Sequence, residues 1–199
     1  MTKYKEIIGT DIEVVTTDPT TTGQVWYNES EGELKTRNQF VGNAWSSGGD
    51  LNTARKYFAG SKSGTQTAAL AFGGNTPPQD YALTEQYDGS SWTEVGDLNT
   101  ARRQLGGAGT YTSGLAFGGG PPIKDETESW NGSSWTEVAD LNTARQSLGG
   151  VGADNTTALG FGGAPAPKAQ TESWNGSSWT ELNDLNSAGD DGGSAGITT

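Results

Sequence analysis

The sequence predicts an all-β protein assembled from a repeat of about 44 residues. Four tryptophans, the last three of them within a Ser-Ser-Trp-Thr-Glu phrase, recur with spacings of 47, 43 and 44 residues. Glycine is abundant, with 31 residues, whereas only 31% of all residues are hydrophobic, and glycine costs about 1 kcal/mol per helical site. A fixed period of this size indicates small units that bury their apolar faces by stacking on their neighbours. We therefore interpret the recurring tryptophans as structural: Trp45, Trp92, Trp135 and Trp179.

The repeat divides the chain into an N-terminal arm with its linker (residues 1–23) and a repeat domain (24–199). Residues 24–50 form a degenerate first repeat that lacks a Phe-Gly-Gly triplet. Three full repeats follow, over about 51–97, 98–140 and 141–184, and 185–199 holds one further strand at most. The arm offers two short strand candidates, at 5–8 and 12–15, and is expected to be extended.

Each full repeat offers four strand candidates, which in the second repeat are 104–109, 113–118, 126–130 and 135–138. The last two are joined through Asn131-Gly132, and Asn-Gly is the strongest short hairpin signal because both residues accept positive φ. The same hairpin signal recurs at Asp88-Gly89 and Asn175-Gly176. Four short antiparallel strands per repeat are typical of a propeller blade.

The repeats resemble kelch repeats. Phe-Gly-Gly, an aromatic residue and then a tryptophan follow one another in kelch order, although the last two are only five residues apart, which is shorter than usual. The resemblance covers roughly residues 50–190 and implies a kelch-like β-propeller of about four blades, each a four-stranded antiparallel sheet. Its residues are Phe72, Phe117 and Phe161, then Tyr87, Trp130 and Trp174, then Trp92, Trp135 and Trp179.

Three forms of this propeller are open. Residues 192–199 complete the degenerate first blade as its missing strand and close a four-bladed ring, or the chain is part of a larger or open propeller. In the third form the ring is shared between chains, which makes the protein a homo-oligomer.

The composition excludes several classes of function. The chain has no cysteine and no histidine, so disulfides, thiolate chemistry, histidine bases and Cys/His zinc sites are excluded, and we expect no metal or cofactor. The net charge of −12 argues against nucleic acid as a partner and against anionic membrane surfaces. No apolar run is long enough for a signal peptide or a membrane span, so membrane insertion is not expected.

Charged residues recur with the repeat. One arginine lies five residues after an aspartate in each full repeat, which predicts a structural Asp–Arg pair per blade; the alternative is a ring of cations that binds an anion. These residues are Asp50, Asp97, Asp140, Arg55, Arg102 and Arg145. The glutamates of the third and fourth strands are expected to face solvent, so no catalytic residue is predicted: Glu85, Glu94, Glu128, Glu137, Glu172 and Glu181.

The loops after Phe-Gly-Gly differ from repeat to repeat and are rich in proline. Loops on a rigid scaffold often carry binding, and proline lowers the entropy lost on binding. The alternative is that these loops diverge because nothing constrains them. The candidate binding residues are Pro77, Pro78, Asp80, Tyr81, Pro121, Pro122, Lys124, Pro165 and Lys168.

The N-terminal part suggests a setting. Residues 17–28, with Gly32-Glu33-Leu34-Lys35, resemble segments of phage tail-fibre and other particle proteins, and the repeats resemble those of phage structural proteins. The resemblance implies a non-enzymatic virion protein whose arm attaches to other virion proteins and whose propeller displays loops to a surface or a host glycan. The alternative is a cellular kelch-type scaffold that binds proteins or glycans, in the cytoplasm or outside the cell without a signal peptide; an enzyme acting on carbohydrates is a third reading.

Overall fold

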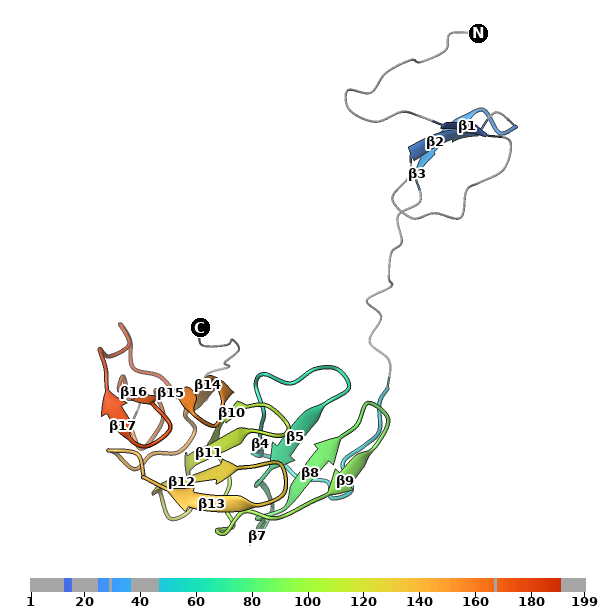
Figure 1. Cartoon of the computed structure of the whole chain (residues 1–199). Coiled ribbons are helices and arrows are strands. Elements are labelled where there is room, and N and C mark those ends of the chain that lie inside the picture. The colour runs from blue at the N-terminus through green and yellow to red at the C-terminus, as the bar shows by residue number, and fades with distance from the viewer. Residues whose placement is uncertain (1–12, 16–24, 29, 37–46, 167, 191–199) are drawn as a thin grey trace. The chain divides into compact units, whose positions relative to one another are not determined.

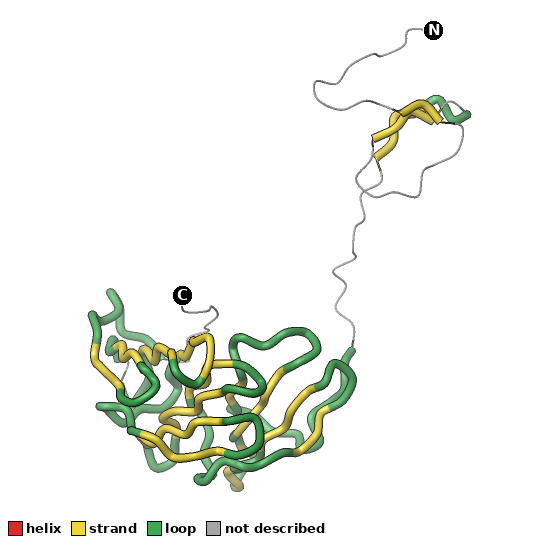
Figure 2. Tube along the Cα trace, viewed as in Figure 1, coloured by secondary structure: helices red, strands yellow, loops and turns green. Residues whose placement is uncertain are grey.

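The protein was analysed as a computed structural model, which describes residues 13–15, 25–28, 30–36, 47–166 and 168–190. Every regular element in these residues is a β-strand, so the predicted all-β class is confirmed (Figure 2). The chain separates into two compact units, residues 1–47 and 48–199.

The first unit contains one three-stranded sheet, made of β1 (Glu13–Val15), β2 (Val25–Asn28) and β3 (Glu33–Thr36). β2 and β3 form an antiparallel hairpin, whereas β1 runs parallel to β2 and so joins the predicted arm to the predicted first repeat. At the hairpin turn, Asn28 accepts hydrogen bonds from Ser30 and Glu31, and Gly32 has a φ of 74°. Trp45 lies outside the described residues, so its structural role stays a prediction. Residues 192–199 also lie outside them, and the closing strand stays a prediction too.

The second unit contains three four-stranded antiparallel sheets, one for each full repeat (Figure 1). The first consists of β4 (Ala59–Gly60), β5 (Ala69–Phe72), β8 (Thr84–Tyr87) and β9 (Trp92–Glu94). The second consists of β10 (Gly106–Gly109), β11 (Gly114–Gly119), β12 (Lys124–Trp130) and β13 (Trp135–Val138). The third consists of β14 (Gly149–Asp154), β15 (Thr157–Phe161), β16 (Thr171–Trp174) and β17 (Trp179–Glu181).

Each sheet is a meander, and the first also has a small hairpin of β6 (Asn75–Thr76) and β7 (Gln79–Asp80) after β5. The predicted hairpin between the third and fourth strands is present: Trp130 pairs with Trp135, and Gly132 has a φ of 96°. Asn131 Oδ1 accepts hydrogen bonds from the backbone N–H groups of Ser133 and Ser134, which fixes this turn.

Aromatic residues join successive sheets. The ring of Trp135, in the second sheet, lies edge-on to Phe72 of the first sheet at 4.9 Å, and its Nε1 donates to Thr84 Oγ1 at 3.0 Å. The contact repeats between the third and second sheets, where Trp179 meets Phe117 at 4.9 Å and donates to Thr127 Oγ1 at 3.0 Å. These tryptophans therefore act as the structural residues that the sequence predicts.

Glycine allows the first strands of successive sheets to approach closely. A Cβ added at Gly107 would lie 2.8 Å from the carbonyl oxygen of Gly60, and one at Gly150 would lie 2.6 Å from that of Gly107. The phenyl rings of Phe72 and Phe117 fill the remaining space beside these two glycines. The core therefore lies between the sheets and depends on positions that have no side chain.

Candidate functional site

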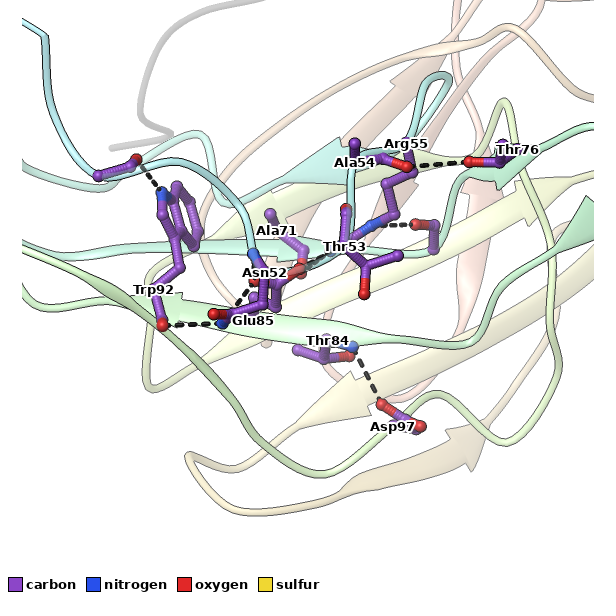
Figure 3. Close-up of polar contacts among 12 residues, drawn as sticks. Asn52, Thr53, Ala54, Arg55, Ala71, Thr76, Thr84, Glu85, Trp92 and Asp97 are labelled. Carbon is purple, nitrogen blue, oxygen red and sulfur yellow. Dashed lines mark hydrogen bonds and ion pairs between the residues drawn. The ribbon is translucent and has the colours of Figure 1, made fainter.

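A buried ion pair recurs in each of the three four-stranded sheets. In the first sheet, Arg55 Nη1 contacts Glu85 Oε1, and Asn52 donates to Glu85 Oε2 from its backbone N–H at 2.7 Å and from Nδ2 at 3.0 Å (Figure 3). Arg55 Nε also donates to the carbonyl oxygen of Gly73 at 2.9 Å. The segment that leads into the first strand thus covers a carboxylate of the third strand.

The second and third sheets repeat this cluster almost atom for atom. Arg102 Nη1 contacts Glu128 Oε1 at 2.7 Å, and Asn99 donates to Glu128 Oε2 from its backbone and side chain at 2.7 and 2.8 Å. In the third sheet the corresponding residues are Arg145, Glu172 and Asn142, with an Arg–Glu distance of 2.7 Å and Asn–Glu distances of 2.8 Å.

The predicted Asp–Arg pairs are wrong, because glutamate is the partner of each arginine. Asp97 and Asp140 instead accept a hydrogen bond from the backbone N–H of Thr84 and Thr127, at 3.0 and 3.2 Å, and so bind the third strand. Asp50, which precedes the first sheet, is exposed.

The expectation that all strand glutamates face solvent is wrong for the third strands. Glu85, Glu128 and Glu172 are each 1% exposed, because the Asn-x-x-Arg segment covers them. The glutamates of the fourth strands are exposed, as predicted: Glu94, Glu137 and Glu181.

The ion pairs are closed structural clusters. Burial acts to raise the pKa of Glu85, but hydrogen bonds from Arg55 and Asn52 outweigh it, so this pKa lies below its ordinary value. In each cluster both carboxylate oxygens already accept hydrogen bonds from protein groups, and the arginine is held beside the carboxylate. These clusters therefore leave no carboxylate oxygen without a protein partner.

The divergent loops after Phe-Gly-Gly form what we call the loop end of the sheets: residues 75–81, 120–124 and 164–168, without residue 167, which is not described. Each loop begins with a backbone bridge to the residue that follows the buried arginine, and these bridges join Lys56 to Asn75, Arg103 to Gly120 and Gln146 to Ala164. The equivalent bridges place the three loops at the same end of their sheets.

A row of left-handed residues lies beside the loop end. Tyr57, Gln104 and Ser147 occupy equivalent positions, one residue beyond these bridges, and have φ values of 58°, 56° and 55°. The N–H of Gln104 donates to the carbonyl oxygen of Tyr57, and that of Ser147 to the carbonyl oxygen of Gln104. This row ties the loop end of one sheet to the next and holds the three loops on one rigid support.

The structure places the candidate binding residues in two groups. The prolines are exposed: Pro77, Pro78, Pro121, Pro122 and Pro165. The other four are half-buried and support the loops: Asp80, Tyr81, Lys124 and Lys168.

Ion pairs hold two of the supporting residues. Asp80 Oδ1 accepts from Arg103 Nη1 of the next sheet at 2.9 Å, and Lys124 Nζ donates to Glu126 Oε1 at 2.8 Å. Burial acts to raise the pKa of Glu126, but the Lys124 hydrogen bond outweighs it and keeps this pKa below its ordinary value. These pairs fix the bases of the first two loops and leave the prolines at their tips.

Sequence reasoning missed an exposed patch of Lys56, Tyr57 and Phe58 at the start of the first sheet. The ammonium of Lys56 lies 5.1 Å from the centre of the Tyr57 ring, and the two rings are 52% and 43% exposed. The signal for this patch is a break in the repeat, because the equivalent positions of the later repeats hold Gln104-Leu105 and Ser147-Leu148. Together with Ile123, which is also exposed, the patch gives the loop end apolar surface next to cations.

A scan against models of known protein families finds no match for this chain, and a search of curated proteins finds none either. The described part of the chain contains no helix long and apolar enough to cross a membrane. In the same residues, no group of three or more Asp or Glu side chains is placed to hold a metal ion.

Proposed function

We propose that this chain is a non-enzymatic binding and structural protein, in which kelch-like propeller blades hold three different loops against another macromolecule or a glycan. The observation that carries the proposal is the contrast within each repeat. The buried Arg–Glu–Asn cluster is the same in all three sheets, whereas the loops supported beside it differ in sequence, and the first is longer than the other two. A uniform scaffold with divergent loops is the usual arrangement of binding surfaces built on rigid folds.

The chemistry of the loop end supports a binding role. Its exposed prolines and the Lys56–Tyr57 pair present rigid apolar and aromatic surface, which loses little conformational entropy when a ligand binds. Hydrogen-bonding groups beside such surface suit a glycan or a protein ligand. Buried carboxylates such as that of Glu128 already accept hydrogen bonds from the arginine and asparagine of their cluster, which favours binding over acid–base catalysis.

We further propose a virion as the setting, with the N-terminal residues attached to other particle proteins. The support is the resemblance of residues 17–28 and 32–35 to segments of phage particle proteins. A cellular kelch-type scaffold is the second candidate, and the same loop end would then bind a cellular protein or glycan.

The binding proposal is tested with a bacterial surface-glycan array and the full chain. Pro77→Ala/Pro78→Ala and Pro121→Ala/Pro122→Ala are expected to weaken binding of any glycan that the wild-type chain retains, with little change in thermal stability. The matched control is Gln66→Ala/Thr112→Ala, which alters exposed residues in the hairpins between the first and second strands, away from the loop end. Equal binding by both loop variants would contradict a role of the loop end.

The setting is tested separately, by mass spectrometry of purified particles of a phage that encodes the chain. Detection at a fixed ratio to the known tail or capsid proteins is expected. Its absence from washed particles would contradict the virion proposal and would leave the binding proposal to the array.

A further inference from the structure

Successive four-stranded sheets of the second unit are joined by one repeated contact, and each sheet contributes one side of it. The first and the third sheet each carry, on the outer face, the residues that form one side of this contact. At each internal interface, the earlier sheet supplies a phenylalanine and a threonine, and the later sheet supplies a tryptophan and a glycine. The third sheet is followed by no sheet among the described residues, and the first is preceded by none in its compact unit. Among the described residues of this unit, the same two halves are present at its ends without the neighbouring sheet that covers them internally.

The outer face of the third sheet offers the phenylalanine and threonine. Phe72 and Phe117 are 0% exposed beneath the tryptophans of the next sheet, whereas their equivalent, Phe161, is half-buried. Thr171 is equivalent to the threonines that accept the indole hydrogen bonds, and it is also half-buried. In the described residues no tryptophan of a following sheet meets this face.

The outer face of the first sheet offers the complementary groups. Phe58 is 43% exposed, whereas its equivalents Leu105 and Leu148 are 6% and 7% exposed, because they pack beside Gly73 and Gly118 of the preceding sheet. Gly60 has no phenyl ring against it among its nearest atoms, although its equivalents Gly107 and Gly150 do.

Trp92 completes this second set. Unlike Trp135 and Trp179, it is only half-buried, and its Nε1 donates to the carbonyl oxygen of Gly49 in the exposed stretch before the sheet. The first sheet therefore presents an indole, a phenyl ring and a glycine slot to whatever precedes it.

We propose that a second copy of this chain occupies these faces, head to tail. In this contact, Phe161 of one copy enters the slot at Gly60 of the other, Trp92 donates to Thr171, and Phe58 lies beside Gly162. At each internal interface, the later sheet packs against the Phe-Gly-Gly strand of the sheet before it, so the partner of the first sheet must also offer such a strand. The Phe-Gly-Gly strands at Phe72 and Phe117 are covered by the next sheet of the same chain, so the strand that another copy can offer is the one at Phe161.

Residues 184–189 must give way in this contact. Leu185 and Gly189 donate their N–H groups to Ala169 and Lys168, as the linkers between the sheets do, so they lie where residues 50–55 of the second copy belong. Leu185 is 39% exposed, whereas its equivalents Leu98 and Leu141 are 4% and 3% exposed. The N–H of Gly163 also donates to the carbonyl oxygen of Gly189, so three backbone hydrogen bonds are exchanged. The incoming segment offers equivalent backbone groups, and the outgoing one has little buried apolar surface to lose.

The contact joins two different faces and is therefore heterologous, which leads to a ring when the rotation closes. On the propeller arrangement proposed above, on which this step rests, two copies contribute six sheets, within the range of about four to eight blades seen in propellers. The inference adds a partner, a second copy, to the proposed function.

The test measures the mass of the full chain by native mass spectrometry and light scattering at micromolar concentrations. The wild-type chain is expected to be a dimer. Phe58→Glu on one face and Thr171→Arg on the other are each expected to raise the dissociation constant by about tenfold or more. The control is Tyr111→Glu, which places the same charge on an exposed aromatic residue outside both faces.

Mixing the two variants separates a head-to-tail contact from a symmetric one. Each variant keeps the face that the other has lost, so an equimolar mixture is expected to regain one of the two contacts and form mixed dimers. A monomeric wild-type chain would overturn the proposal. So would a dimer that survives Phe58→Glu or Thr171→Arg, or a mixture of folded variants that stays monomeric, with folding checked by circular dichroism. Thr171→Arg changes no residue of the loop end or of the patch of Lys56, Tyr57 and Phe58, so its effect on the dimer is separate from ligand binding at the loop end.

Discussion

The third and fourth strands of the second sheet contain the same dipeptide in opposite surroundings. Thr127-Glu128 in β12 is buried, with Glu128 1% exposed, whereas Thr136-Glu137 in β13 is exposed. The two glutamates are direct partners in the antiparallel register, so neither strand type nor pairing explains the difference. Both dipeptides recur in every repeat, which means that recurrence alone does not tell a buried carboxylate from a solvated one.

The segment that enters the sheet causes the difference. Asn99 and Arg102 lie over β12 and supply three hydrogen bonds to Glu128, while β13 is the edge strand and has no such cover. A buried carboxylate is tolerated only when it is paired and hydrogen-bonded, which this segment achieves. The comparison predicts that equal substitutions at the two glutamates have very different effects.

The largest effect is expected for Glu128→Ala. It leaves the guanidinium of Arg102, which is fully buried, without its counter-charge, and breaking a buried pair in this way costs about 3–5 kcal/mol of unfolding free energy. The measurement is urea unfolding followed by tryptophan fluorescence.

Glu137→Ala is the matched control, in the facing position of the same sheet. Because Glu137 is exposed, we expect its unfolding free energy to change by less than about 0.5 kcal/mol. Similar losses in the two variants would refute the view that the covering segment, and not the strand position, gives the carboxylate its role.

A smaller loss of stability is expected from a substitution between the first strands of neighbouring sheets, β10 and β14, which approach each other closely. In Gly150→Ala the new methyl group would lie 2.6 Å from the carbonyl oxygen of Gly107, a backbone atom that cannot rotate away. Overpacking of this kind costs about 1–3 kcal/mol. Gly114→Ala is the control, since its methyl group would meet its nearest atom at 3.4 Å, an ordinary contact within a buried strand. If thermal unfolding ranks the control as the less stable of the two, the close approach of the first strands is not what stabilises the array.

Much of the fold follows from the sequence because its signals are local. The Asn131-Gly132 turn and the recurring tryptophans locate the third and fourth strands, and these strands are present in the structure. β10 begins at Gly106, two residues later than predicted, because Gln104 has a positive φ that a strand cannot contain. The hairpin of β6 and β7 was not predicted, since it depends on a bridge from Asn75 to Lys56, nineteen residues earlier in the chain.

The buried clusters could not be assigned correctly from spacing. The aspartate five residues before each arginine was the nearest carboxylate in sequence, but the true partner lies 26 to 30 residues away, on the third strand. Only the folded path of the Asn-x-x-Arg segment brings the two together. The divergent loops, in contrast, were recognisable because they break the repeat. The aromatic patch at Tyr57 and Phe58 also breaks the repeat, but this signal was missed.

The smallest effect is expected at the outermost turns, where the first sheet differs from the other two. Asp88 stands where the later hairpins have Asn131 and Asn175, and all three accept hydrogen bonds from the two residues after the glycine. The backbone N–H of Ser91, then the hydroxyl and N–H of Ser90, lower the pKa of Asp88 from 3.8 to about 2. Because the folded pKa is the lower one, ionised Asp88 stabilises the fold above about pH 4, and this contribution is lost as the pH falls towards 2.

Asp88→Asn is therefore expected to change stability little at pH 7 and to make the unfolding midpoint less sensitive to acid between pH 4 and pH 2. The reciprocal change, Asn131→Asp, introduces the same carboxylate into the second hairpin and is expected to add acid sensitivity over the same range. Urea unfolding of the three chains at pH 7, 4 and 2.5 measures both effects. Parallel pH profiles would mean that the exposed turns contribute no linked proton, and that acid sensitivity comes from the covered carboxylates such as Glu85, whose pKa is also lowered in the folded chain.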